Sequence, residues 1–433
     1  MFLKTLPLVF VLAGLVLYTV LAGADFGAGM WRLLAGGGER GDRIRDHAHH
    51  SMGPVWEANH VWLIFVITVA WTAYPVFVGS VASTLAVPFV IAALGIIVRG
   101  ASYALRAAAS SSREFRMVDG SFAVASLVTP FALGTMAGAI AAERVPVGNA
   151  AGGMFSSWTG AVPILIGVLA VAFSAYLAAV YLAADAARHG DPELAEAYRV
   201  RALSAGTAAG ALAVVGLIVV HADAHSLYTG LVHGAALAVL IMSLLAGAAA
   251  LVLVATRRFE PARYVAALAV AGVVAGWAFA RYPVLLPGLT VGQAAAPHDT
   301  LVAVVIAVLA GGAILFPSLA LLFGLLLRGR LGEPATAAPG TEPATASPGR
   351  EPATVPPAPA RGRPPRSTSL QTRVAVALLI AGVGFLNAAD AGWAHLIGVF
   401  SLFGFMVIGF AAIVPRALAE DPDQLPPPAS GLG

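Results

Sequence analysis

The chain has 433 residues, of which 59% are hydrophobic and 11% charged, whereas about 25% of the residues in soluble domains are charged. This composition excludes an ordinary soluble protein. The net charge of the chain is only +3, and the basic residues are scattered along the sequence, so we expect no nucleic-acid partner. The chain has no cysteine, which excludes disulfides, thiolate nucleophiles and cysteine-held metal clusters.

Apolar runs long enough to cross a bilayer recur along the chain. The first run continues into a Gly-Ala-Asp-Phe-Gly sequence without a cleavage pattern, so we interpret it as a retained helix rather than a cleaved signal. Nine runs precede a break in composition, and two shorter runs follow it. The predicted spans are 6–27, 59–80, 82–104, 120–142, 159–184, 202–221, 229–255, 263–282, 300–327, 373–390 and 394–415.

Composition divides the chain into four parts. Residues 1–330 contain the nine predicted spans, and residues 331–372 form a Pro/Ala-rich segment in which a unit beginning Glu-Pro-Ala-Thr recurs. Because such a segment has little apolar surface to bury, we expect a disordered cytoplasmic linker. Residues 373–416 are predicted to form a transmembrane hairpin, and residues 417–433 a cytoplasmic tail.

The distribution of basic residues predicts the orientation of the spans. Loops after the odd-numbered spans carry most of the arginines, whereas the opposite side carries Lys4, Arg144 and Arg281. Cytoplasmic loops are enriched in lysine and arginine. We therefore predict that the N-terminus lies outside the cell and the C-terminus in the cytoplasm.

Polar residues cluster around the first two predicted spans. Asp25 ends the first helix, and Glu57 and His60 begin the second, so all three are expected at a similar depth on the cytoplasmic side. Intramembrane ionisable groups often line proton or ion routes, and histidine and a desolvated carboxylate exchange protons near neutral pH. Two interpretations stay open: these residues relay protons, or they form a polar cluster that holds two helices together.

Other features of the spans have packing or interface interpretations. Gly23 and Gly27 stand four residues apart, which predicts close packing of the first helix on another. Arg99, at the end of the third span, either extends its side chain to the cytoplasmic interface or forms a functional ion pair. The histidine-rich segments 47–50 and 221–225 match no specific ligand spacing, so we expect no metal site.

Two segments resemble subunit II of cytochrome bd-type quinol oxidases: residues 23–30 (GADFGAGM) and residues 53–64 (GPVWEANHVWLI). The resemblance covers about residues 1–330. It implies an all-α polytopic membrane protein with a core of nine helices, arranged as two four-helix bundles and a peripheral helix. To this core the chain adds its C-terminal two-helix extension.

The resemblance also implies a function for the chain within a complex. The complex is a quinol:oxygen oxidoreductase of the bacterial cell membrane that reduces oxygen to water, with haem b and haem d bound mainly by a partner, subunit I. The present chain is then expected to support assembly of subunit I and to contribute a proton route, without being catalytic alone. Quinol and oxygen are the implied substrates, and membrane lipid and a small accessory subunit are further expected partners.

The resemblance assigns roles to individual residues. Asp25, Glu57 and His60 become the candidate proton route. Ala22 and Ala104 stand where the family often has acids, which reduces the number of protonatable positions. The residues expected to support the geometry of the route are Trp56, Asn59, Trp62 and Arg99.

Two alternatives from other functional classes stay open. A secondary transporter would also use intramembrane acids and broken helices, although the two halves of the chain show no convincing repeat. A membrane cytochrome that binds haem itself would need axial ligands. The candidate ligands on or near predicted helices are His60, His221, His233 and His395.

Overall fold

The computed structural model describes residues 2–106 and 111–327, together with scattered positions between 370 and 408. The chain divides into two units, Met1–Ala335 and Thr336–Gly433. In the second unit the described residues are helical. The predicted linker, most of the predicted hairpin and the tail lie outside the described residues.

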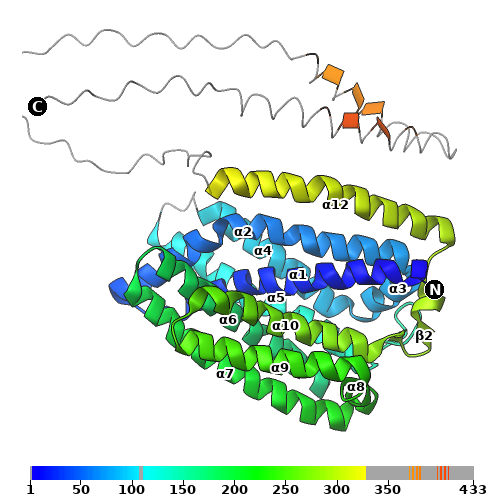
Figure 1. Cartoon of the computed structure of the whole chain (residues 1–433), viewed down its shortest axis with the longest axis horizontal. Coiled ribbons are helices and arrows are strands. Elements are labelled where there is room, and N and C mark those ends of the chain that lie inside the picture. Colours follow the sequence, from blue (N-terminus) through cyan, green and yellow to red (C-terminus); the bar gives the residue numbers. More distant parts are fainter. Residues whose placement is uncertain are drawn as a thin grey trace, which may run out of the picture. The chain divides into compact units, whose positions relative to one another are not determined.

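The first unit is built from helices and one short β-hairpin (Figure 1). The helices are α1 (Phe2–Leu33), α2 (Gly38–Ala73), α3 (Pro75–Thr84), α4 (Ala86–Arg106), α5 (Ser112–Ala141), α6 (Ala161–Arg188), α7 (Pro192–Asp223), α8 (His225–Leu231), α9 (Gly234–Ala255), α10 (Phe259–Arg281), α11 (Val291–Ala294) and α12 (His298–Leu327). The hairpin pairs β1 (Val284–Leu286) antiparallel with β2 (Leu289–Thr290).

The number of spanning helices agrees with the nine spans predicted within residues 1–330. Within the described residues, eight helices are long and apolar enough to cross a membrane, and the bent pair α2–α3 brings the number up to nine. The expected all-α polytopic fold is therefore confirmed.

Two predicted spans are interrupted in the structure. The span predicted over 59–80 bends by 119° between α2 and α3. Pro75 has no N–H group to continue the helix and disfavours helical geometry at Tyr74, which adopts φ −138° and ψ 62°. The span predicted over 229–255 breaks between α8 and α9, where Gly234 adopts a positive φ of 58°.

The long helices form two groups that meet along α1 and α6. Helix α1 packs against α2, α5 and α6, and α4 packs against α5, whereas α6 also contacts α7 and α10, and α9 packs on α10. Helix α12 lies beside α1 and α2 (Figure 1). This arrangement agrees with the expected two four-helix groups and a peripheral helix.

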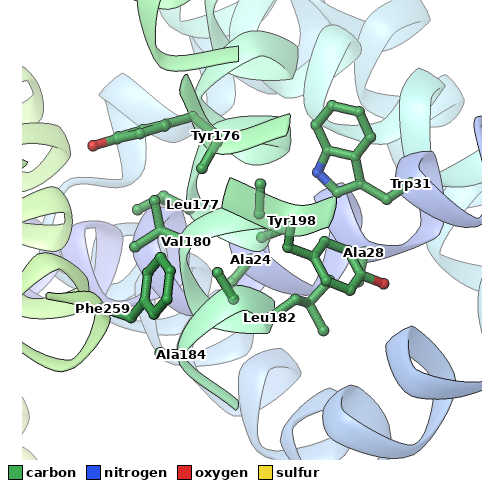
Figure 2. Close-up of a cluster of buried hydrophobic side chains, with 14 of the residues drawn as sticks. Ala24, Ala28, Trp31, Tyr176, Leu177, Val180, Leu182, Ala184, Tyr198 and Phe259 are labelled. Atoms are coloured by element: carbon green, nitrogen blue, oxygen red, sulfur yellow. The ribbon is translucent and has the colours of Figure 1, made fainter. Parts of the chain in front are cut away.

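The largest core cluster surrounds α6 and is rich in alanine. Ala178, Ala179 and Ala183 are completely buried there, and Figure 2 shows Leu177 and Val180 of α6 in this cluster together with Ala24 of α1 and Phe259 of α10. Small side chains let neighbouring helices approach closely, which is the usual packing mode of membrane helices.

The predicted packing role of the first-helix glycines is confirmed. A Cβ atom placed on Gly27 would collide with the backbone carbonyl of Ser174 in α6, and one on Gly23 would lie 3.4 Å from Leu177 Cδ1. The Trp31 indole adds a hydrogen bond of 2.8 Å to the Ala175 carbonyl. Helix α1 is therefore fixed against α6 along the segment that contains Asp25.

Candidate functional site

Asp25 lies within α1 and not at its end, which corrects the sequence-based expectation. The helix continues to Leu33 because residues 26–31 are apolar and buried, and it ends before Gly36, which has a positive φ of 81°. Helix α2 begins at Gly38, so Glu57 and His60 lie well inside it. The polar residues are therefore held by continuous helices and not by a connecting loop.

Asp25 forms an ion pair with Arg99 of α4. Arg99 Nη2 lies 2.6 Å from Asp25 Oδ2, and the side chains are 0% and 4% exposed. The interpretation of Arg99 as an interface anchor is wrong, because the guanidinium is completely buried. A buried charge is costly unless it is paired, so each residue depends on the other to be tolerated inside the bundle.

Aromatic rings and one hydroxyl enclose the Arg99 guanidinium. Its Cζ atom lies 4.7 Å from the ring centroid of Phe26 and 4.3 Å from that of Phe122, positions that allow cation–π attraction. Its Nη1 donates a hydrogen bond to Ser126 Oγ, and this hydroxyl donates to the Phe122 carbonyl at 2.6 Å. The pair is thus surrounded by side chains from α1 and α5.

Helix α2 contributes two of the expected supporting residues. Asn59 is completely buried, and its Nδ2 donates to the Leu21 carbonyl at 3.2 Å, one helical turn before Asp25. Trp62 packs against the α1 cluster that contains Tyr18 and Phe26. Asn59 and Trp62 therefore fix α2 on the same part of α1.

The other candidate residues also lie on α2. Trp56 and Glu57 belong to α2, but their side chains lie outside the described part of the structure. His60 is half-buried next to Asn59. The structure thus brings Asp25 together with Arg99, while a contact from Glu57 or His60 to Asp25 stays a prediction.

A second charged cluster, which the sequence analysis did not single out, lies nearer the ends of the same helices. Asp119 of α5 accepts a hydrogen bond from Arg32 of α1 and another, of 3.2 Å, from Arg106 of α4. The spacing contains a usable signal: Asp119, Phe122 and Ser126 stand three and four residues apart, so they share one face of α5. This face meets Arg32 and Arg99, which explains why the acid occurs beside an apolar span.

Ion pairs also join the helices at the opposite end of the bundle. Arg281 binds Glu143 and Arg144 binds Asp223 at 3.0 Å. These arginines belong to the side that the sequence analysis found poor in basic residues. There, Glu143 has a pKa below its ordinary value, first because of the hydrogen bond from Arg281.

A bound metal ion or haem would need side chains that converge on it as ligands. Within the described part of the chain, no group of three His, Cys, Asp or Glu side chains is arranged to hold a metal ion. The rings of His221 and His225 are 5.3 Å apart, but both residues are exposed at one end of the bundle. His395 lies outside the described residues. Among the described histidines, His221, His225 and His233 are exposed, whereas a haem ligand inside the bundle would be buried.

Comparisons with known proteins agree with one another. The family model described as cytochrome bd terminal oxidase subunit II matches residues 3–326. Cytochrome bd ubiquinol oxidase subunit 2 of Bacillus subtilis is 31% identical over 116 residues, which is 27% of this chain and 33% of that protein. The alignment thus spans about a third of that relative's length.

A solved structure shares the fold. A chain in the structure of bd oxidase from Geobacillus thermodenitrificans is similar with a TM-score of 0.61 and 23% sequence identity, and the match covers 76% of the present chain and 99% of that chain. Neither the transporter nor the haem-ligating alternative gains support from these comparisons.

Proposed function

The chain belongs to the cytochrome bd terminal oxidase subunit II family, and from this premise we propose that it is the supporting subunit of a bacterial quinol:oxygen oxidoreductase. Its partner is subunit I, which it stabilises during assembly. Haem b and haem d, bound mainly by subunit I, supply the electron transfer from quinol to oxygen. The chain itself is not catalytic alone.

The proposed contribution of this chain to turnover is a cytoplasmic proton route through Asp25, Glu57 and His60. The buried Asp25–Arg99 ion pair carries this proposal, since a carboxylate inside the bundle is retained at a considerable energetic cost. A proton that reaches Asp25 neutralises its carboxylate and weakens its attraction to Arg99. Loss of the proton to the next acceptor restores the ion pair.

The supporting residues hold in place the helices that carry the route. Asn59 holds α2 on α1 through the Leu21 carbonyl, and Trp62 packs beside Phe26; Trp56 has the corresponding role next to Glu57. Of the two positions that lack the family's acids, Ala22 is buried on α1 and Ala104 is exposed on α4. The route therefore proceeds without a carboxylate at either position.

Substitution of the acids tests this route. The variant Asp25→Asn keeps the shape of the side chain but cannot exchange a proton, and Glu57→Gln does the same on α2. Because Asp25→Asn also leaves Arg99 unpaired, the yield of assembled complex is expected to fall, and activity is therefore compared per haem. On that basis we expect the double variant to slow both quinol-driven oxygen consumption and proton uptake. Unchanged turnover and proton uptake would contradict the route.

The control for this experiment is Asp299→Asn. Asp299 is fully exposed at the start of α12, so removing its charge is expected to leave proton uptake unchanged. An equal loss of activity in this control would show that the assay responds to charge in general.

The C-terminal part has a separate proposed role. The linker 331–372 tethers the hairpin 373–416, which docks at the periphery of the complex or against a small accessory subunit. Deletion of residues 331–433 is expected to weaken retention of such a subunit while leaving the core assembled. Labelling of tags at the two ends tests the proposed external N-terminus and cytoplasmic C-terminus.

A further inference from the structure

A small cavity lined by both apolar and charged residues lies where the ends of α1, α4 and α5 meet α2. It has about 10 Å³ of room for water-sized atoms, roughly enough for one water molecule or one ligand oxygen. Arg106 ends α4 and Arg32 lies in the last turn of α1, so the cavity is at the arginine-rich end of these helices. The polar residues that line it are Arg32, His49, Ser102, Tyr103, Arg106 and Asp119.

The charges that line the cavity do not balance. The single carboxylate of Asp119 forms ion pairs with two guanidiniums, those of Arg32 and Arg106. One positive charge therefore remains when His49 is neutral. Farther out on α2, Asp46 attracts both Arg32 and Arg106, whereas Arg45, which pairs with Asp42, repels Arg32.

Arg32 also has an unused hydrogen-bond donor. Its side chain is only 4% exposed, and its Nε atom is buried without a hydrogen-bond partner. A buried charged donor without a partner is costly. An anionic acceptor at the cavity would reduce this cost.

His49 responds to the same positive charge. Burial, followed by repulsion from Arg106, Arg32 and His50, lowers the pKa of His49 to about 4. His49 lies in the polar first part of α2, ahead of the apolar segment Asn59–Ala73, and its ring contacts Tyr103 with centroids 5.5 Å apart. At neutral pH the imidazole is therefore uncharged and able to donate or accept a hydrogen bond.

These observations favour an anion over a proton as the occupant. A positive field opposes the approach of hydronium, as basic residues do in pores that exclude protons. The same field attracts a phosphate oxygen, and basic pockets between membrane helices commonly bind lipid headgroups. The cavity's size admits one such oxygen, with the rest of the headgroup outside.

We propose that this cavity binds a phosphate oxygen of an anionic phospholipid headgroup. Arg32 and Arg106 supply the charge, and the hydroxyls of Ser102 and Tyr103 and the imidazole of His49 supply hydrogen bonds. The bound lipid fastens α4 and α5 to α1 and α2 at the membrane surface. This site does not depend on the proposed proton route.

Lipid binding by charge-altered variants tests the site. The full-length chain, purified with its partner subunit in neutral detergent, is titrated with short-chain phosphatidylglycerol, and binding is measured by native mass spectrometry. Arg106→Gln is expected to weaken binding about tenfold, the effect of losing one charged hydrogen bond. Asp119→Asn removes the competing carboxylate and is expected to strengthen binding.

The matched control is Arg116→Gln, which removes an exposed charge from the same end of α5 and is expected to bind like the unaltered chain. Phosphatidylcholine, which has no net charge, is expected to bind more weakly, and inorganic phosphate is added as a competitor. Equal affinity of the unaltered chain, Arg106→Gln and Asp119→Asn for phosphatidylglycerol would overturn the proposal. If inorganic phosphate alone shows the expected variant dependence, the lipid assignment is overturned and the phosphate chemistry stands.

Discussion

At the scale of single residues, the Asp25–Arg99 ion pair imposes the strongest constraint on the bundle. Each charge is tolerated because the other lies 2.6 Å away, while Phe26 and Phe122 exclude water from the guanidinium. Removing one partner of a buried pair costs about 3–5 kcal/mol, whereas replacing both is often nearly neutral. The pair is therefore open to a test by single and double substitution.

The first prediction concerns this pair. Arg99→Met leaves a buried carboxylate unpaired and is expected to destabilise the chain by about 3–5 kcal/mol. The double variant Arg99→Met/Asp25→Asn is expected to recover part of that loss. Thermal unfolding of the purified proteins measures both, and a double variant at least as unstable as Arg99→Met would contradict the pairing.

The second prediction concerns the pH dependence at His49. Its pKa of about 4 in the folded protein lies below the ordinary value near 6.5, so the unfolded chain takes up the proton first as the pH falls. Stability is therefore expected to decrease as the pH falls from about 6.5 to about 4. In His49→Gln the loss of stability between these pH values should disappear, as measured by melting curves recorded across the pH range. A variant with the same pH dependence as the unaltered chain would refute the prediction.

Sequence alone identified the members of the site better than their contacts. Asp25 and Arg99 each stand out as charges in apolar spans, but their pairing depends on how the helices pack, which the sequence does not display. Asp119 was not singled out, because an acid at the start of a span is normally an interface residue, although its spacing from Phe122 and Ser126 places it on the same face of the helix. Its function becomes clear only when Arg32 and Arg106 are seen to converge on it.

At the scale of helices, close contact between α1 and α6 positions the site. The sequence predicted close packing from Gly23 and Gly27, but not the identity of the partner, since an alanine-rich surface looks the same on several spans. In the structure Gly27 meets the Ser174 backbone. The position of Asp25 relative to Arg99 depends on this contact.

The third prediction is that Gly27→Val separates α1 from α6. Backbone atoms at this contact cannot move aside as a flexible side chain can, so we expect a marked loss of stability and a lower yield of assembled complex. The control is Gly210→Ala in α7, where an added Cβ meets nothing within 4 Å and is expected to be neutral or slightly stabilising. Equal behaviour of the two variants would contradict the packing.

The fourth prediction concerns the start of α7. Asp191 accepts a hydrogen bond from the Leu194 N–H at 3.0 Å and pairs with Arg43. Asp191→Ala is expected to cost about 1 kcal/mol through loss of the helix cap, whereas Asp191→Asn should retain most of the stability because asparagine also caps.

The charge of Asp191 adds a pH dependence. The Leu194 hydrogen bond, and then Arg43, lower the pKa of Asp191, so its charge stabilises the fold above the ordinary pKa of an aspartate, about 4. This contribution is lost as the pH falls through the lower folded pKa. The test compares the melting temperatures of the unaltered chain and Asp191→Asn across the pH range. If their difference grows toward low pH, this assignment is contradicted.

At the scale of the whole molecule, the fold class was predictable because long apolar runs can only be helices in a bilayer. The interruptions were harder to predict, because proline and glycine are frequent throughout these spans. Pro7, Pro130 and Pro317 lie inside continuous helices, yet Pro75 begins a new helix. What distinguishes them is the packing of neighbouring helices, which a single sequence does not display.

The central claim is that this chain supports a haem-bearing partner and is not a cytochrome by itself. The most direct measurement is to purify the chain with and without subunit I in mild detergent, and to record the reduced-minus-oxidised spectrum together with quinol-driven oxygen consumption. We predict haem bands and oxygen consumption only when subunit I is present. Haem bands in the isolated chain would contradict the claim and would make its histidines ligands.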